Sequence, residues 1–302
     1  MHLLPTEDQR ALREAVRDLC AGIDLAREDH LVDPALWGRL AEMGVFTLRV
    51  PEADGGVGLG LTDAVLVFEE LGRSAVPGPL VATHLAGSAT RRVGLVERPA
   101  EPGPLLVEHL ADLDDLWVLD GDRLSRVDPG ALDATPTARP LDPWTPVHRV
   151  AALPPGEPVG ADVRRLRLEG ALLTAALQAG IAAAALSRSV RYVSEREQFG
   201  RPVGSFQAVK HAAADMLVRL ELARAAVHAA AATPGLPPRA VSAAKLLADE
   251  AATRNCLAAV QLHGGMGFAW EVEVHYFLKR AWVHDVSWGD ADAHAEQIAA
   301  AL

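Results

Sequence analysis

The stretch YVSEREQFG, residues 192–200, lies between two long runs rich in Ala and Leu, and it fixes how the second half of the chain is organised. A second stretch, QLHGGMG at residues 261–267, follows about sixty residues later. Apolar residues recur with helical spacing around both stretches, and Ser205 is expected to cap the run from Phe206. The turn TPGLPP, residues 233–238, separates two long helices, and the second should end at Gly264 and Gly265. The sequence therefore predicts a C-terminal helical bundle over residues 164–302.

The remaining residues divide into a helical segment and a strand-rich segment. Residues 1–98 have helix signals: Thr6 and Gln9 form a capping-box pattern, and Asp33 stands before a Pro at the first helical position. Residues 99–163 are rich in Pro and Asp, and the short apolar pieces 116–119 and 147–150 are separated by turns. We therefore predict a mainly α protein with an N-terminal helical domain (1–98), a reduced β-rich middle domain (99–163) and the C-terminal bundle (164–302).

The composition limits the classes of partner. With 302 residues, half of them hydrophobic, and a formal charge of −11, the chain should be a globular protein without a nucleic-acid surface. Two cysteines within helical patterns, Cys20 and Cys256, fit the reducing cytoplasm. The apolar run at residues 171–186 contains Thr, Gln and Gly, so we interpret it as a buried core helix and expect no membrane span.

Together, the two stretches resemble the flavin-contacting motifs of the acyl-CoA dehydrogenase family, whose members use FAD to desaturate acyl-CoA thioesters. The resemblance implies that Arg196 reaches the FAD pyrophosphate of a neighbouring protomer, a task for which a planar guanidinium is well suited. It also implies that Phe199 packs near the adenosine half and that Gln198 offers a neutral hydrogen bond. Gln261, Gly264 and Gly265 would lie against the nucleotide, since glycines allow close backbone approach.

A simpler interpretation exists for each of these residues. Arg196 could be an exposed arginine at a helix end that forms a surface ion pair. Gly264 and Gly265 could serve only as a helix C-terminus. His263, between them and the helix, is assigned a structural role. The presence of both motifs at the family's spacing favours the functional interpretation over the simpler one.

The resemblance fails where the catalytic base should be. Most family members place a glutamate immediately before a Gly near the C-terminus, and here that position is Trp288, which cannot take a proton from the substrate. A few relatives place the base on the helix that opens the C-terminal domain, where this chain has Gly170. Glu169 beside it is the remaining candidate, although one residue along a helix turns a side chain by about 100 degrees.

Elements that would hold the chain's own flavin are also missing. Nothing between Pro99 and Val163 resembles the family's Thr/Ser-rich flavin motif, and Asp290 and Asp292 replace a flavin-contacting Thr and Gln. Carboxylates near a pyrophosphate are repulsive. The chain therefore resembles the degenerate, non-catalytic subunit of the heteromeric actinobacterial acyl-CoA dehydrogenases, in which a competent partner holds the FAD.

Three hypotheses remain open at this point. The leading one is a subunit of a flavin-dependent acyl-CoA dehydrogenase that completes the FAD site of a catalytic partner chain. The second is a self-sufficient dehydrogenase, associating with itself, with Glu169 as a relocated base. The third is a non-enzymatic acyl-CoA-binding or scaffold protein. In each case we expect the helices from Leu166 onward to form the subunit interface, because their small apolar side chains suit close packing.

Overall fold

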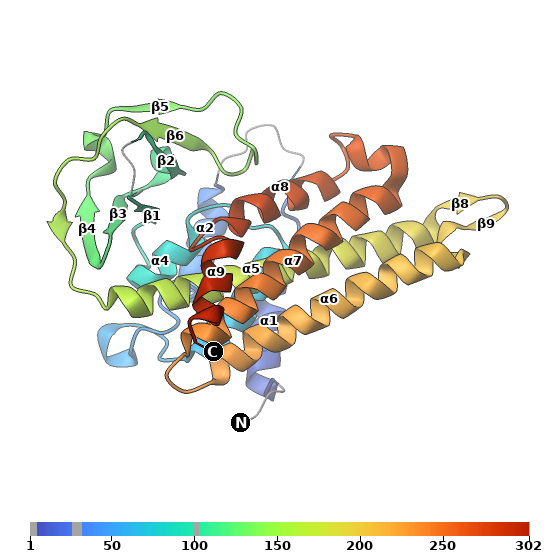
Figure 1. Ribbon diagram of the computed structural model, residues 1–302, viewed down its shortest axis with the longest axis horizontal. Helices are drawn as coiled ribbons and strands as arrows, with labels where there is room; N and C mark the ends of the chain where they lie inside the picture. Colours follow the sequence, from blue (N-terminus) through green and yellow to red (C-terminus); the bar gives the residue numbers. More distant parts are fainter. Residues whose placement is uncertain (1–4, 26–31, 99–102, 302) are drawn as a thin grey trace. The chain divides into compact units, whose positions relative to one another are not determined.

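The computed structural model describes residues 5–25, 32–98 and 103–301, which form two compact units. The helical unit comprises Met1–Glu28, Leu61–Val76 and Ala171–Leu302, and the mixed unit comprises Asp29–Gly60 and Pro77–Gly170. The predicted fold class is confirmed, because helices dominate both ends of the chain and short strands fill the middle (Figure 1). The three-domain division stays a prediction, and its first boundary, at Pro99, lies outside the described residues.

The helical unit is built around long helices that pack along their lengths. Helices α6 and α7 run side by side, and the β8–β9 hairpin projects beyond the end of α5 in Figure 1. The unit contains α1 (Glu7–Leu19), α3 (Leu61–Arg73), most of α5 (Val163–Glu195), β8 (Glu197–Gln198), β9 (Arg201–Pro202), η4 (Val203–Ser205), α6 (Gln207–Ala232), α7 (Pro238–His263), η5 (Gly264–Phe268), α8 (Val274–Asp285) and α9 (Ala291–Ala299).

Two glycines bring α3 and α5 into backbone contact. A Cβ added to Gly72 would stand 2.0 Å from the carbonyl oxygen of Leu177, and one added to Gly180 would stand 2.0 Å from that of Glu69. Any larger residue would force the helices apart, so both positions need glycine. Helix α5 is deeply buried, and 89% of its most apolar window lies within the protein. That burial is typical of a core helix, although its length and composition alone would suit a membrane span.

The mixed unit contains two small sheets. One has the strand order β1-β3-β4-β7, in which β1 and β3 are parallel, and the other has the order β2-β6-β5. Their shared core includes Leu116, Val118 and Val150. The unit contains α2 (Pro34–Glu42), η1 (Glu52–Asp54), α4 (Leu80–Ala86), β1 (Val93–Glu97), β2 (Leu105–Glu108), η2 (Leu110–Asp112), β3 (Asp115–Asp120), β4 (Arg123–Val127), η3 (Pro129–Ala131), β5 (Ala134–Pro136), β6 (Val147–Val150) and β7 (Glu157–Pro158).

Most local predictions are confirmed at the residues that carry them. Thr6 and Gln9 form the capping box, and Asp33 accepts a hydrogen bond from Ala35 N at the start of α2. The prediction for Ser205 is wrong. Val203–Ser205 forms a 3₁₀ turn, so α6 begins at Gln207 with Phe206 as its N-cap and no side-chain capping bond. The turn absorbs the serine and shifts the helix start downstream.

Candidate functional site

The first motif ends in a tight hairpin that turns Phe199 outward. Gln198 pairs with Arg201 across β8 and β9, which leaves Phe199 and Gly200 as the two loop residues. Both have positive φ, 55° and 73°, as the favoured two-residue hairpin turn requires. The Phe199 side chain is 91% exposed. An aromatic ring this exposed to solvent either promotes aggregation or serves as a contact for another molecule.

Arg196 and Gln198 are also exposed at this hairpin. The backbone of Arg196 is fixed, because its N–H donates to Tyr192 O at 2.9 Å and its carbonyl accepts from Val203 N–H at 2.7 Å. Its guanidinium forms no ion pair with another residue in the described parts of the chain. The ion pair that the simpler interpretation of Arg196 would require is therefore not formed with any described residue, and the charge is available to an external anion. Gln198 Nε2 donates locally to Glu197 O at 2.8 Å.

The second motif ends α7 with an open glycine pair. Gln261 lies exposed in the last turn of the helix, and α7 stops at His263 as predicted. Gly264 has φ 60° and ψ −140°, a conformation that side chains disfavour, so it must be glycine. A Cβ added to Gly264 or Gly265 would meet no other described atom within 4 Å. The space in front of this backbone is open, so a ligand could approach it closely.

A ring stack joins the two motifs. Tyr192 of α5 and His263 of α7 have ring centroids 4.3 Å apart and planes inclined by 20°. His263 Nδ1 lies 2.7 Å from Ala259 O, and burial lowers the pKa of the imidazole. A neutral, buried ring suits the structural role that was expected for His263. The stack places both motifs at the same end of the helical unit.

Exposed apolar side chains that the sequence did not single out follow the glycine pair. Met266, Phe268 and Trp270 are 51%, 81% and 61% exposed. The indole of Trp270 is held by Lys279, whose Nζ lies 4.1 Å from the ring centroid. The only signal for them was their position just after a motif already assigned to cofactor binding. Together with Phe199, they make up a set of strongly exposed apolar side chains within or just after the two motifs.

Glu169 is engaged in ion pairs within the mixed unit. Its carboxylate accepts from Arg49 Nη1 at 2.7 Å and Nη2 at 2.8 Å, and from Arg165 Nε at 2.5 Å. Burial alone would raise the pKa of this carboxyl, but the hydrogen bonds and charges of the two arginines hold it below its usual range. Both oxygens are occupied, and the group is a weaker base than an ordinary glutamate. The geometry therefore argues against Glu169 as a relocated base.

Trp288, which the sequence predicts to stand at the position of the family's usual base, is partly buried. Trp288 has φ 63°, which is rare for a bulky residue, and Gly289 follows with φ 105°. Asp290 caps α9 by accepting from Ala293 N–H at 2.9 Å, and Asp292 lies in the first helical turn. Both carboxylates thus have a local role as partners of the helix N-terminus.

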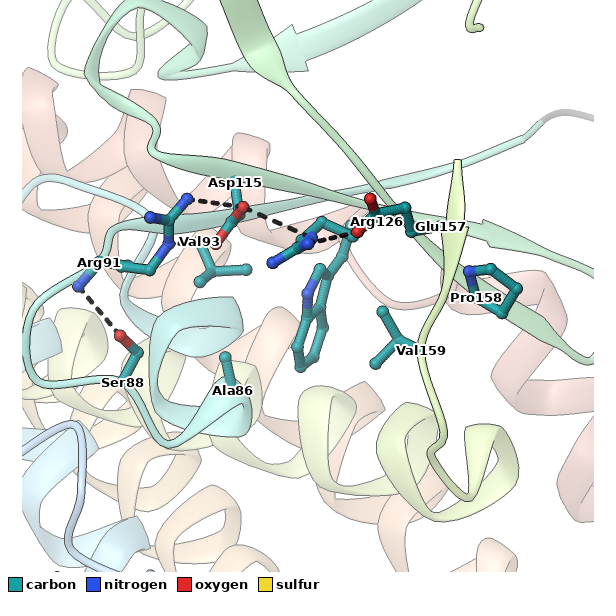
Figure 2. Close-up of a pocket in the computed structure, with 10 residues that line it drawn as sticks. Ala86, Ser88, Arg91, Val93, Asp115, Arg126, Glu157, Pro158 and Val159 are labelled. Carbon is teal, nitrogen blue, oxygen red and sulfur yellow. Dashed lines mark hydrogen bonds and ion pairs between the residues drawn. The ribbon is translucent and has the colours of Figure 1, made fainter. Parts of the chain in front are cut away.

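A separate pocket of about 370 Å³ lies in the mixed unit, and no predicted site residue lines it. Figure 2 shows a chain of ion pairs across it, from Arg91 to Asp115 and Arg126 to Glu157. Because two arginines meet two carboxylates, the charges cancel, and the pocket offers little attraction for an anion. Its lining residues are Ala86, Ser88, Arg91, Val93, Asp115, Trp117, Arg126, Glu157, Pro158 and Val159.

Residues 164–302 match the acyl-CoA dehydrogenase C-terminal domain, and residues 6–97 match the acyl-CoA dehydrogenase N-terminal domain. The chain belongs to the acyl-CoA dehydrogenase family. Acyl-CoA dehydrogenase IpdE2 of Mycolicibacterium smegmatis is 38% identical over 296 residues, covering 91% of this chain and 93% of that protein. IpdE2 of Mycobacterium tuberculosis is 36% identical over 300 residues, covering 92% of each protein.

Solved structures confirm the fold over nearly the whole chain. A variant of the Tcur3481–Tcur3483 steroid ACAD superposes with a TM-score of 0.84 at 25% identity, covering 97% of both chains. The ChsE4–ChsE5 complex from Mycobacterium tuberculosis gives 0.81 at 23% identity, covering 99% of this chain and 98% of that one. These similarities extend the acyl-CoA dehydrogenase architecture through the reduced middle segment.

Proposed function

We propose that this chain is a non-catalytic subunit of an FAD-dependent acyl-CoA dehydrogenase and completes the FAD site of a catalytic partner chain. The observation that carries the proposal is the outward orientation of both motifs. Arg196, Gln198, Gln261, Gly264 and Gly265 are all exposed, as is Phe199. Residues that served the chain's own cofactor would be expected to line an internal cleft.

The residues at this end fit a phosphate-bearing group held by another molecule. The exposed guanidinium of Arg196, which forms no ion pair with another described residue, can donate two parallel hydrogen bonds to phosphate oxygens. Gly264 and Gly265 leave the backbone accessible, and Phe199 offers an exposed ring face. FAD supplies hydride acceptance when it is bound in this family. This chain would neutralise the phosphate charge of FAD and provide a contact surface for the nucleotide half of that cofactor.

The absence of a usable base supports the non-catalytic part of the proposal. Trp288 holds the usual position, and the alternate position is Gly170. Glu169 is tied to Arg49 and Arg165, with its pKa lowered. Abstraction of a substrate α-proton needs a free carboxylate within hydrogen-bond reach. We infer that the partner supplies it.

The names of the similar structures support a heteromeric assembly. Two of them are described as the steroid ACAD Tcur3481–Tcur3483 and the ChsE4–ChsE5 complex. By analogy, the substrate of the assembled enzyme would be a lipid- or steroid-derived acyl-CoA, and the location would be the cytoplasm. The partner would be a longer acyl-CoA dehydrogenase chain with Glu before its C-terminal Gly.

Co-expression tests the proposal. The chain would be purified alone and with the neighbouring acyl-CoA dehydrogenase chain, and FAD per polypeptide would be measured from flavin absorbance. We expect no flavin and no dehydrogenase turnover from the chain alone. The complex should bind FAD at about one molecule per pair of chains and turn over acyl-CoA with an artificial electron acceptor.

The possible outcomes separate the three hypotheses. Flavin and turnover in the chain alone would overturn the proposal in favour of a self-sufficient dehydrogenase. A chain that binds acyl-CoA but joins no flavoprotein would favour the scaffold hypothesis. As a control for nonspecific loss of flavin, the Arg239→Ala complex should keep its FAD, because Arg239 is exposed at the far end of α7.

A further inference from the structure

Lys245 of α7 is an unusual residue, because its ammonium group is fully buried. Its Nζ lies 2.5 Å from Asp249 Oδ2, 3.0 Å from His284 O and 3.2 Å from Asp285 O. The last two are carbonyls at the C-terminal end of α8, and His284 O also accepts from Ser287 N–H at 3.2 Å. Lys245 therefore neutralises a buried carboxylate and caps the end of α8 at the same time.

The carboxylate of Asp249 extends this contact to α5. Gln178 Nε2 donates to Asp249 Oδ1 at 3.0 Å and to Ala281 O of α8 at 2.9 Å. Gln178 is itself completely buried. Three helices are thus fastened together just before the segment 286–290 that contains Trp288.

Ser242, one turn before Lys245 on α7, fastens the other side of the same segment. Its hydroxyl donates to Gln297 Oε1 at 2.9 Å and lies 3.0 Å from Nδ1 of the buried His294, both on α9. The ring of His294 also limits the loop directly, because a Cβ on Gly289 would stand 3.0 Å from its Nε2. One helix, α7, therefore holds the end of α8 and the start of α9.

Between these anchors, Trp288 adopts a left-handed conformation at φ 63°. Such a conformation is strained for a residue with a bulky side chain and persists only where the surroundings impose it. A buried ion pair is also an expensive way to stabilise a fold, since apolar residues of similar volume often do as well or better. The strained backbone at Trp288 and the buried Lys245–Asp249 pair together indicate that the surrounding helices impose one conformation on segment 286–290.

We propose that Lys245 and Ser242 are positioning residues that hold Trp288 in one fixed conformation. The inference rests on the proposed function, in which residue 288 stands at the position of the family's base. It adds that the segment in which the base was lost is a rigid part of this chain and not a mobile, decayed loop.

The test observes Trp288 directly. The full chain would be labelled with 5-fluorotryptophan, and Trp288→Phe would identify its resonance among the six tryptophans. We expect one narrow Trp288 signal in the wild type. Lys245→Met combined with Asp249→Asn should broaden or move this signal more than any other. Ser242→Ala should do the same from the α9 side, and it settles the question if the double variant does not fold.

The matched control lies on the same helix. Arg254 and Glu250 form an i,i+4 ion pair on α7 like Lys245 and Asp249, but their side chains are 64% and 54% exposed. Arg254→Met with Glu250→Gln should leave the Trp288 signal unchanged. A Trp288 signal that is averaged in the wild type, or that is unaffected in the folded Lys245 and Ser242 variants, would overturn the proposal. Since neither FAD nor a partner is needed, this result is independent of the co-expression experiment.

Discussion

The carboxylate of Glu69 on α3 lies 3.4 Å from Nε2 of His228 on α6, inside the helical unit. Arg13 of α1 and Arg224 of α6 also reach Glu69, at 3.3 and 2.8 Å. Burial alone would raise the pKa of this carboxyl, but the nearby imidazole of His228 and the hydrogen bonds and charges of the two arginines outweigh it and lower the pKa to about 2. One buried charge thus holds three helices together.

We predict that Glu69 makes the protein sensitive to acid. Because the folded pKa is about 2 and the ordinary value is 4.5, its contribution is complete above pH 4.5 and is lost as the pH falls toward 2. The shift corresponds to about 3 kcal/mol. Glu69→Gln should lower the free energy of unfolding at neutral pH by about that amount and weaken the acid dependence, as measured by urea titration. Glu250→Gln, at an exposed pair, should change it by less than about 1 kcal/mol.

Asp249 should act in the opposite direction. Its burial raises the pKa to about 7 from 3.8, against the attraction of Lys245. A raised carboxyl pKa contributes stability that is complete below pH 3.8 and is lost as the pH rises through 7. Asp249→Asn should therefore flatten the decline in unfolding free energy between pH 4 and 7. A decline of unchanged slope in this variant would show that another group titrates.

Glu169→Gln should affect stability and leave turnover unchanged. The carboxylate joins Arg49 and Arg165, and removal of one partner from a buried pair costs about 3–5 kcal/mol. We expect a lower unfolding midpoint for the chain and an unchanged turnover number for the assembled enzyme. Abolished turnover in a complex that still folds and binds FAD would instead identify Glu169 as a base.

The helices and turns of the fold could be predicted because their signals are local. Thr6 with Gln9, Asp33 before Pro34, and Gly264 after α7 each satisfy backbone groups within a few residues. The prediction of Ser205 as a helix cap was wrong because serine is compatible both with a 3₁₀ turn and with the start of an α-helix. The pairing of the strands was not predictable, since contacts such as β1 with β3 depend on residues distant in the chain.

The features of the candidate site also fall into two groups, those that local sequence predicts and those that depend on residues distant in the chain. The outward position of Phe199 follows from the turn formed with Gly200, which is a local feature. In contrast, the capture of Glu169 by Arg49 joins residues 120 positions apart, and the burial of Lys245 depends on carbonyls of α8. Helical periodicity places Glu169 beside the alternate base position at Gly170. It contains no information about Arg49, which binds the Glu169 carboxylate from a distant part of the chain.

The exposed apolar face of α6 is predicted to lie in the subunit interface. Leu217, Val218 and Leu222 are 49%, 58% and 55% exposed, and burial of the exposed half of each would contribute about 0.7–1.5 kcal/mol. Val218→Asp with Leu222→Asp should therefore weaken assembly at least about a hundredfold, as measured by light scattering over a concentration series. Leu106→Asp, at a 61% exposed residue of β2, is the matched control and should assemble normally. Equal assembly of all three proteins would place the interface elsewhere.

Arg196 provides the most direct test of the shared FAD site. If its guanidinium contacts the pyrophosphate of FAD held by a partner, Arg196→Ala removes charge-assisted hydrogen bonds worth about 1.5–3 kcal/mol. The dissociation constant of FAD from the complex should then rise by about one to two orders of magnitude. Arg196→Lys should recover only part of this, because an ammonium cannot make the same bidentate contact. Circular dichroism should show an unchanged fold, since the side chain forms no ion pair within the described chain. An unchanged FAD dissociation constant in Arg196→Ala would mean that this arginine is a surface residue and that the hairpin contacts something other than the cofactor.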